Sequence, residues 1–186
     1  MYVGTASSST LMFRLSTWDS GLMHVRPGDP DDVEDVGRLH ALSRRAAYAH
    51  LVDADALRLL TTESQAGFWQ DRLRADPPPN ALFVVETTRG VEGFTYGSAR
   101  GQQATLHAIH VLPDMLGSGA GQLLHDRLLE QFTHWGCTQA ELSVLSGNDR
   151  AQAFYRRNGW LPDGRGAEHA IGGVTVPVVG FRRALP

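Results

Sequence analysis

The chain has 186 residues, of which 42% are hydrophobic and 20% charged, and its net charge is −3. This is the composition of an ordinary folded protein with one sizeable core, and the 17 basic residues, all arginine, form no cluster of the kind that binds nucleic acid. No apolar run reaches the roughly 20 residues that span a bilayer, and the single Cys137 excludes an internal disulfide and fits a reducing compartment. We expect a cytoplasmic enzyme or binding protein with neither a membrane nor a nucleic acid as partner.

The first 22 residues differ from the rest of the chain. They are rich in Ser and Thr and show no hydrophobic period, which favours a flexible extension over an added edge strand or a misassigned start. Residues 23 to 186 show periodic patterns with no linker and no internal repeat, so we assign them to one domain.

The first half of this domain reads as one short strand and two helical zones. Residues 23 to 28 predict the strand, and Asp31 or Asp32 is expected to cap a helix whose apolar residues recur at helical spacing. A second helical zone begins near Asp55 and is expected to break near Thr61. The prolines of DPPPN end it, because proline cannot continue a helix.

The second half is dominated by strands. Two apolar segments joined by the turn TRG predict an antiparallel hairpin, and a third strand follows. Beyond a glycine-rich loop, apolar residues at helical spacing predict a helix that stops at Gly136. A further strand leads to Asn148, which is expected to cap a helix that Asn158 and Gly159 end. Together these elements predict a mixed α/β sandwich. The strands of this half are expected at 81–87, 91–99, 104–113, 137–145 and 174–185.

The strand ATLHAIHVLP changes its apolar phase partway along. Ala104 and Leu106 stand at even positions and Ile109 at an odd one. Because side chains of a strand alternate between its two faces, all three can face the same side only if the strand contains one extra residue. We infer a β-bulge near His107 and Ala108, which would separate this strand from the one that follows and open a slot in the sheet. The alternative is that the small alanine merely interrupts the pattern.

The stretch VLPDMLGSGAGQLL places Gly117, Gly119 and Gly121 ahead of a leucine-rich helix. Glycine lets the backbone approach a ligand closely, and the first N–H groups of a helix lie at the positive end of its dipole, so an anion such as a phosphate is the natural occupant. Tight packing of the helix on the sheet is the alternative. No GK[ST] follows, so the loop is not a P-loop, and the preceding hairpin fits a dinucleotide-binding unit poorly.

A second motif, NDRAQAFYRRNGW, follows the next strand. Together with the glycine loop, the stretch from Leu106 to Trp160 resembles the GCN5-related N-acetyltransferase superfamily, whose motifs read Arg/Gln-x-x-Gly-x-Gly/Ala and Asn-x-x-Ala-x-x-Phe-Tyr-x-x-x-Gly-Phe/Trp. The resemblance covers nearly everything from Met23 onward and is to a bacterial branch. The residues that match the two motifs are Gly119, Gly121, Asn148, Ala151, Phe154, Tyr155, Gly159 and Trp160.

The resemblance implies a single-domain GNAT fold, whose mixed, mostly antiparallel central sheet is flanked by helices and splayed at the strands that bind acetyl-CoA. It implies that the pyrophosphate of acetyl-CoA lies on the backbone of the glycine loop and the pantetheine arm along the strand before it. The residues implied to bind this cosubstrate are Ile109, His110, Val111, Leu116, Gly117, Ser118, Gly119, Ala120, Gly121, Gln122, Asn148 and Tyr155.

The loop departs from the family pattern in its charge. Leu116 stands where the family usually has Arg or Gln, and Ser118 is neutral where a cation is frequent, so charge-assisted bonds from the loop to a phosphate are missing. Weaker binding of coenzyme A or loss of catalysis is one consequence. The other is that a nearby arginine supplies the charge, and the candidates are Arg127, Arg150, Arg156 and Arg157.

Acetyl transfer to nitrogen needs a neutral amine, whereas a free alkylamine has a pKa near ~10. A histidine that accepts the proton would help. His107 stands where relatives often carry a glutamate and is the first candidate base, with His110 and Glu86 behind it. Tyr155 is the candidate acid for the departing thiolate. A hydrogen-bonded strand residue is the alternative for each histidine, and packing under the cofactor is the alternative for Tyr155.

The acceptor pocket is the least defined part of the site. The resemblance implies that residues of the first helices border it, and core or solvated surface is the alternative for each candidate. The candidates are Arg44, Arg45, Tyr48, His50, Trp69 and Tyr96. The histidines form no set with metal-ligand spacing, so no metal is expected.

We therefore predict an acetyl-CoA-dependent N-acetyltransferase that transfers the acetyl group directly to a primary amine of a small molecule or peptide. Two alternatives stay open: a catalytically silent module that binds acyl-CoA, and an acyltransferase that uses another acyl donor or a hydroxyl acceptor. The sequence does not identify the acceptor. It is compatible with a homodimer.

Overall fold

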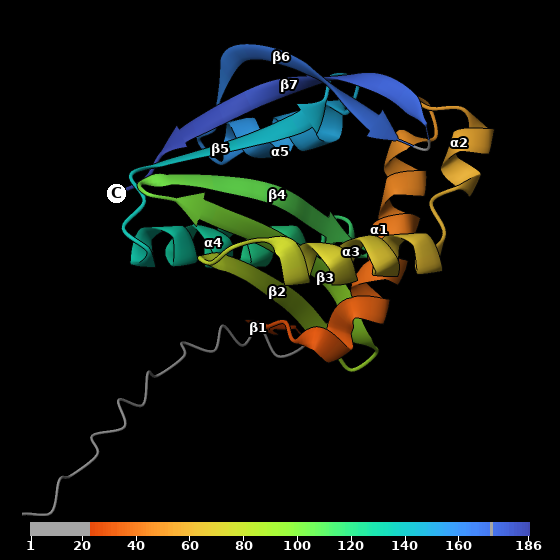
Figure 1. Ribbon diagram of the computed structural model, residues 1–186, viewed down its shortest axis with the longest axis horizontal. Coiled ribbons are helices and arrows are strands. Elements are labelled where there is room, and N and C mark those ends of the chain that lie inside the picture. The colour runs from red at the N-terminus through yellow and green to blue at the C-terminus, as the bar shows by residue number, and fades with distance from the viewer. Residues whose placement is uncertain (1–22, 172) are drawn as a thin grey trace, which may run out of the picture.

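A seven-stranded sheet runs through the part of the protein that the computed structural model describes, residues 23–171 and 173–186. The strands lie in the order β1-β2-β3-β4-β5-β7-β6 (Figure 1), and among them β4 and β5 are the one parallel pair. The predicted extension, residues 1 to 22, lies outside the described residues. The strands are β1 (His24–Pro27), β2 (Asn80–Thr87), β3 (Gly90–Arg100), β4 (Gln103–Val111), β5 (Gln139–Leu145), β6 (Leu161–Ile171) and β7 (Val174–Ala184).

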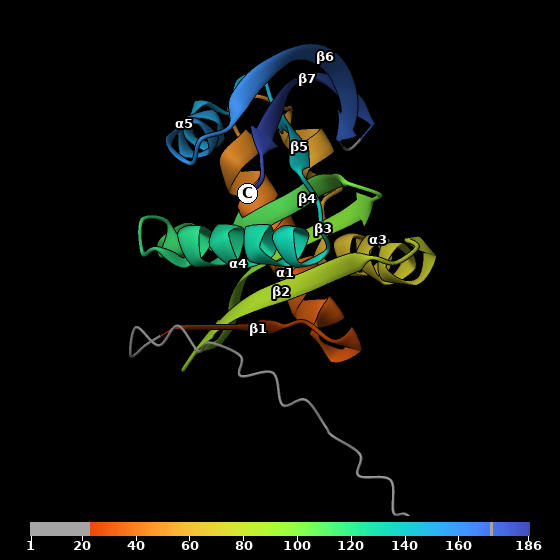
Figure 2. The same cartoon turned by 90° about the vertical axis from the view of Figure 1, so that its left-hand side faces the viewer.

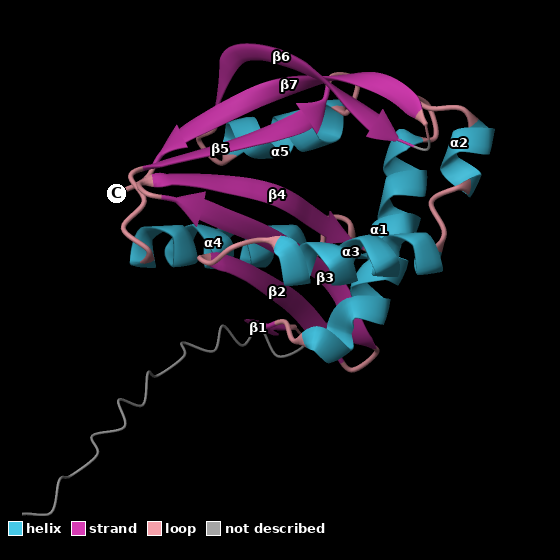
Figure 3. Ribbon diagram, viewed as in Figure 1, coloured by secondary structure: helices cyan, strands magenta, loops and turns pink. Residues whose placement is uncertain are grey.

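Helices cover both faces of this sheet (Figure 2, Figure 3). One face carries α4 and α5, and the other carries α1 and α3, which pack against each other. None of the helices in the described ranges is long and apolar enough to cross a bilayer. The helices are α1 (Val33–Tyr48), α2 (Ala54–Arg58), α3 (Thr62–Ala75), α4 (Ala120–His134) and α5 (Asp149–Arg157), with short 3-10 turns at Pro30–Asp32 and Pro113–Met115.

Each face of the sheet has its own apolar core. On one face Leu124, Leu128 and Phe132 of α4 are fully buried, which confirms the apolar helix side predicted for this segment. On the opposite face Trp69 and Phe94 pack edge to face with ring centres 5.1 Å apart. Burying a side chain of this size contributes roughly 1.5–3 kcal/mol, so the two cores hold the helices firmly on either side of the strands.

The start of α1 differs from the prediction in its cap. Asp29, rather than Asp31 or Asp32, accepts the capping bond: its Oδ1 receives the N–H of Asp31 at 2.8 Å. Asp32 directly precedes α1, but its carboxylate makes no capping bond to that helix because it binds the guanidinium of Arg26 at 2.8 Å. Pro30 supplies the reason, since proline favours the first helical position and so moves the cap one turn upstream.

The predicted bulge is confirmed in β4. Tyr96 of β3 faces Ala108, and the next residue, Gly97, faces Leu106, so His107 is the extra residue of the bulged strand. A bulge bends its strand and increases the local twist. β4 therefore turns away from its neighbour beyond this point.

The sheet splays between β4 and β5, as expected from the bulge. The two strands pair only from Gln103 opposite Gln139 to Thr105 opposite Glu141, and then separate. Figure 1 shows them close together at one end and apart at the other, where α1 crosses. The far part of β4 consequently has a backbone edge that β5 does not cover.

Strand β6 adds an element that was not predicted. It forms a long antiparallel hairpin with β7, from Leu161 opposite Arg182 to Ile171 opposite Val174. Nearly all of its side chains are exposed, so it lacks the apolar alternation by which strands are recognised. The β6–β7 hairpin closes one side of the opening between β4 and β5.

Candidate active site

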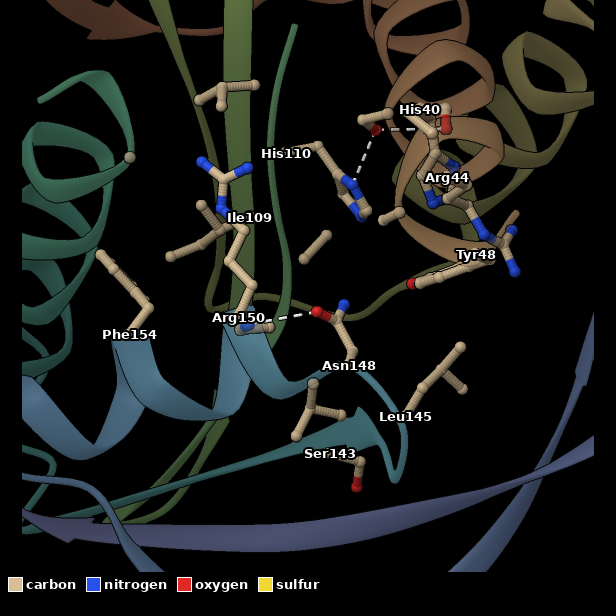
Figure 4. Close-up of a pocket in the computed structure, with 18 of the residues that line it drawn as sticks. His40, Arg44, Tyr48, Ile109, His110, Ser143, Leu145, Asn148, Arg150 and Phe154 are labelled. Carbon is tan, nitrogen blue, oxygen red and sulfur yellow. Dashed lines mark hydrogen bonds between the residues drawn. The ribbon is translucent and has the colours of Figure 1, made fainter. Parts of the chain in front are cut away.

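A cavity of about 1290 Å³ fills the opening between β4 and β5. Residues 105–111 of β4 and 143–145 of β5 line it, and it reaches both faces of the sheet, with the glycine loop and α5 on one side and α1 and α3 on the other. Figure 4 shows side chains of α1, β4 and α5 directed into the same space. Sites for one small ligand usually measure about 300–1,000 Å³, so this cavity is large enough for two reactants that meet through the sheet.

The glycine loop presents free backbone donors to the cavity. The N–H groups of Gly117, Gly119 and Gly121 have no hydrogen-bond partner among the described residues, whereas those of Ser118 and Gln122 bond to carbonyl groups nearby. Gly117 and Gly119 have φ angles of +87° and +95°, which glycine adopts without strain. Three free N–H groups at the positive end of α4 form a cradle for an anion.

The packing of the protein does not require glycine at position 121. The φ of Gly121 is not positive, and a Cβ atom at this position would meet no protein atom within 4 Å. Glycine inside a helix costs roughly 0.5–1 kcal/mol relative to alanine. The missing side chain keeps the space above the free N–H groups open to a ligand.

Positive charge near the cradle comes from α5. Arg150 and Arg157 line the cavity. Arg127 lies in another hollow, where its guanidinium covers the ring of Phe83 at 4.3 Å, and Arg156 donates to Gln152 at 3.1 Å. Two of the four arginines weighed as replacements for a loop cation thus line the same cavity as the glycine loop.

The residues predicted to bind the cosubstrate are brought together by the fold. All of them line the cavity except Ser118 and Ala120. Ser118 instead accepts the N–H of Ala120 through its Oγ at 3.2 Å, and Ala120 is fully buried. Leu116, which stands where the family usually has Arg or Gln, lines the rim of the cavity and is 44% exposed.

Helix α5 places two polar groups in the cavity. Asn148 caps the helix, since its Oδ1 accepts the N–H of Ala151 at 3.1 Å (Figure 4), which confirms the predicted cap and leaves its amide NH₂ as a donor. The ring of Tyr155 is buried against Trp160 and Phe181. Burial, with the nearby hydroxyl of Tyr48, raises the pKa of Tyr155, so this phenol stays protonated at neutral pH.

On the other face of the sheet, the buried His40 and the half-buried His110 form a polar cluster with α1 and α3. Trp69 Nε1 donates to His40 Nδ1 at 3.0 Å, and Ser43 Oγ lies 2.8 Å from His110 Nδ1. The two imidazole rings are 4.7 Å apart. Burial lowers the pKa of His110 to about 3, and the charge of Arg44 adds to this effect, so the ring is neutral at pH 7.

Helix α1 contributes His40, which the sequence analysis missed, beside the pocket candidates Arg44 and Tyr48. His40, Arg44 and Tyr48 recur every four residues and therefore share one side of the helix, which faces the cavity (Figure 4). This spacing was visible in the sequence. What was not visible is that the polar side faces a cavity rather than solvent.

The remaining candidates divide between the cavity and other places. His107 lines the cavity at its rim, where its Nε2 is 2.7 Å from Ser98 Oγ. Desolvation of the ring, together with the charge of Arg72, lowers the pKa of His107 to about 4. Glu86 lies away from the cavity and binds Arg26 at 2.8 Å. Tyr96 is fully buried behind the site and donates its hydroxyl to Asp76 at 2.8 Å.

No candidate metal centre accompanies the cavity. In residues 23–171 and 173–186, no three His, Cys, Asp or Glu side chains are grouped closely enough to hold a metal ion.

Comparisons with known proteins agree with this geometry. The chain is 26% identical over 133 residues to the uncharacterized N-acetyltransferase YuaI of Bacillus subtilis, covering 68% of this chain and 74% of that protein. It is 33% identical over 70 residues to thialysine N-epsilon-acetyltransferase of Bos taurus, where the match spans 38% of this chain and only 41% of the cattle enzyme.

The fold also matches solved structures. The PaiA N-acetyltransferase of Thermoplasma acidophilum, solved in complex with coenzyme A, superposes with a TM-score of 0.71 at 14% sequence identity, over 87% of this chain and 99% of that one. In addition, the sequence profile of the acetyltransferase (GNAT) family matches residues 45–160, which include α5 and the glycine loop. The predicted α/β GNAT fold is confirmed, and the chain belongs to the acetyltransferase (GNAT) family.

Proposed function

We propose that the protein transfers an acetyl group from acetyl-CoA directly to a primary amine of a small molecule or peptide. The observation that carries this proposal is the row of free N–H groups at Gly117, Gly119 and Gly121, at the mouth of a cavity that passes through the splayed sheet. Coenzyme A in the PaiA structure and the N-acetyltransferase names of the two sequence relatives support it. The similarity to YuaI also supports the bacterial affinity suggested by the sequence.

The residues that line the cavity fit the pyrophosphate, pantetheine and thioester parts of acetyl-CoA. The cradle and the guanidinium groups of Arg150 and Arg157 would hold the pyrophosphate. The edge of β4 that β5 leaves uncovered, around Ile109, would pair with the amides of the pantetheine arm. Backbone N–H groups of this edge would polarise the thioester carbonyl, whose carbon the amine attacks as the thiolate of coenzyme A leaves.

His110 is the favoured proton acceptor, ahead of His107. When Ser43 donates to the carbonyl of His40, 3.3 Å away, its Oγ can accept Nδ1–H of His110, and Nε2 of His110 is left with a free lone pair. His107 instead directs its Nε2 toward Ser98. Tyr155, held protonated by burial, supplies a proton to the departing thiolate.

Two measurements test this function. Titration calorimetry with coenzyme A tests the cradle, and release of free thiol from acetyl-CoA with a broad amine panel tests transfer. Binding without turnover on any acceptor would favour the silent acyl-CoA-binding module instead. Propionyl-CoA and hydroxyl acceptors, run in the same assay, test the other alternative.

A further inference from the structure

Arg44 carries a charge that no carboxylate balances. Its Nη1 donates to Gln65 Oε1 at 3.2 Å, and its guanidinium lies 5.7 Å from the ring centre of Tyr48, but none of the described carboxylates forms an ion pair with it. Arg72, in the same wall of the cavity, differs because Asp76 binds it at 3.0 Å. A half-buried cation without a counter-ion is costly in a folded protein.

The surroundings of Arg44 make this end of the cavity electropositive. The imidazoles of His40, His110 and His169 lie near it and are neutral at pH 7, because burial and the charge of Arg44 lower the pKa of each. The carboxylates that line the whole cavity are Asp149 and Glu168, and both are exposed. Such a pocket repels an acceptor with a second ammonium group, as in a polyamine, and attracts one with an anionic group.

We infer that the amine acceptor carries a carboxylate, and that Arg44 binds this carboxylate and so directs the amine toward the gap between β4 and β5. This inference rests on the proposed function. A guanidinium presents paired donors that match a carboxylate in two parallel hydrogen bonds, which fixes direction as well as adding affinity. Arg44 stands one helical turn from His40 and from Tyr48. Figure 4 shows these side chains of α1 beside His110 of β4, so an acceptor held there lies near His110.

Binding of the carboxylate also serves the proton transfer. The charge of Arg44 is one of the two causes that lower the pKa of His110, and an anion on Arg44 offsets it. His110 then becomes a better base only when an acceptor of this class is bound.

The test compares amino acids with their α-carboxamides as acceptors, in thiol-release assays with wild type and with Arg44→Gln. Wild type should acetylate the best free acid with a kcat/KM at least about tenfold above that of its amide, which corresponds to 1.4 kcal/mol. Arg44→Gln should bring this ratio close to 1, mainly through KM, and Arg44→Lys should keep part of it. Arg45, the next residue of α1, does not line the cavity. Arg45→Gln removes one positive charge as Arg44→Gln does and should leave the ratio of acid to amide unchanged.

The outcomes separate this inference from the proposed function. Equal use of acids and amides, or a preference that Arg44→Gln retains, overturns the inference while amine acetylation stands. Absence of thiol release with every amine removes the proposed function instead. In that case the inference is tested by titrating amino acids into the complex of the protein with coenzyme A in a calorimeter. Binding that is lost in Arg44→Gln supports the inference, and absence of binding to wild type overturns it.

Discussion

Nδ1 of His110 on β4 lies 2.8 Å from Oγ of Ser43 on α1. This contact joins the bulged strand to the helix that forms the opposite wall of the cavity. It lies beside the bond from Trp69 to His40, in a region where the neighbouring rings are aromatic and buried. The two histidines are therefore part of the structure of the site as well as of its proposed chemistry.

The first prediction concerns the pH dependence of stability. Burial lowers the pKa of His110 to about 3 and also lowers that of His40, whereas an unfolded chain has histidines near 6.5. Below pH 6.5 the unfolded state binds protons that the folded state refuses. The free energy of unfolding should thus fall as the pH drops from 7 to 5, by at most about 1.4 kcal/mol per pH unit for each histidine. Urea denaturation at several pH values measures this slope.

His110→Gln provides the comparison. Glutamine can still hydrogen-bond Ser43 but does not titrate, so the variant should show a shallower slope than wild type between pH 7 and 5. Identical slopes would mean that His110 takes up its proton in the folded state at an ordinary pH. That result would contradict a buried, neutral ring.

The second prediction separates stability from ligand binding at Gly121. Alanine at this helical position meets no protein atom within 4 Å, so Gly121→Ala should stabilise the protein by roughly 0.5–1 kcal/mol. The same methyl group would cover the free N–H groups of the cradle, and the Kd of coenzyme A should rise about tenfold. Thermal melts and calorimetry give the two numbers.

Gly67 in α3 offers a matched control, because a Cβ atom there also meets nothing within 4 Å. Gly67→Ala should raise stability by a similar amount and leave coenzyme A binding unchanged. If Gly121→Ala binds coenzyme A as well as wild type does, the phosphates do not lie on this part of the loop.

The third prediction divides the two roles of Asn148. Asn148→Ala removes the cap of α5 and should cost about 1 kcal/mol of stability together with some affinity for coenzyme A. Asn148→Asp keeps an oxygen that accepts the N–H of Ala151 and so should retain the stability. It removes the NH₂ donor and adds a negative charge near the phosphates, so it should bind coenzyme A more weakly than the alanine variant does. The reverse order of affinities would show that Asn148 acts only as a cap.

Local signals explain why much of the fold could be predicted. The apolar segments of β2, β3 and β4, the cap at Asn148 and the phase change at His107 each depend on residues close together in the sequence. Strand β6 escaped prediction because Gly164, Gly166 and a row of exposed side chains leave it without an apolar face. Its strand character comes from pairing with β7.

The candidate site shows the same division. The glycine loop and the α5 motif could be recognised because each is one contiguous stretch. The His110–Ser43 contact joins residues 67 positions apart, and nothing local to either one indicates it. For the same reason Tyr96 was expected in the acceptor pocket: its position on β3 was correct, but only the packing of α3 over the strand shows that Trp69 lies between it and the cavity.

The last prediction concerns Tyr155. If its phenol protonates the departing thiolate, Tyr155→Phe should lower kcat by roughly 100-fold or more and leave the Kd of coenzyme A nearly unchanged, because the ring keeps its contacts with Trp160 and Phe181. Burial raises the pKa of this phenol above its ordinary value, so wild-type kcat should show no loss from its ionisation up to pH 9. Phe154→Leu alters a neighbouring ring without touching a hydroxyl and serves as the control for packing. An unchanged kcat in Tyr155→Phe, measured where thiol release is slower than product dissociation, would assign the proton to water rather than to this residue.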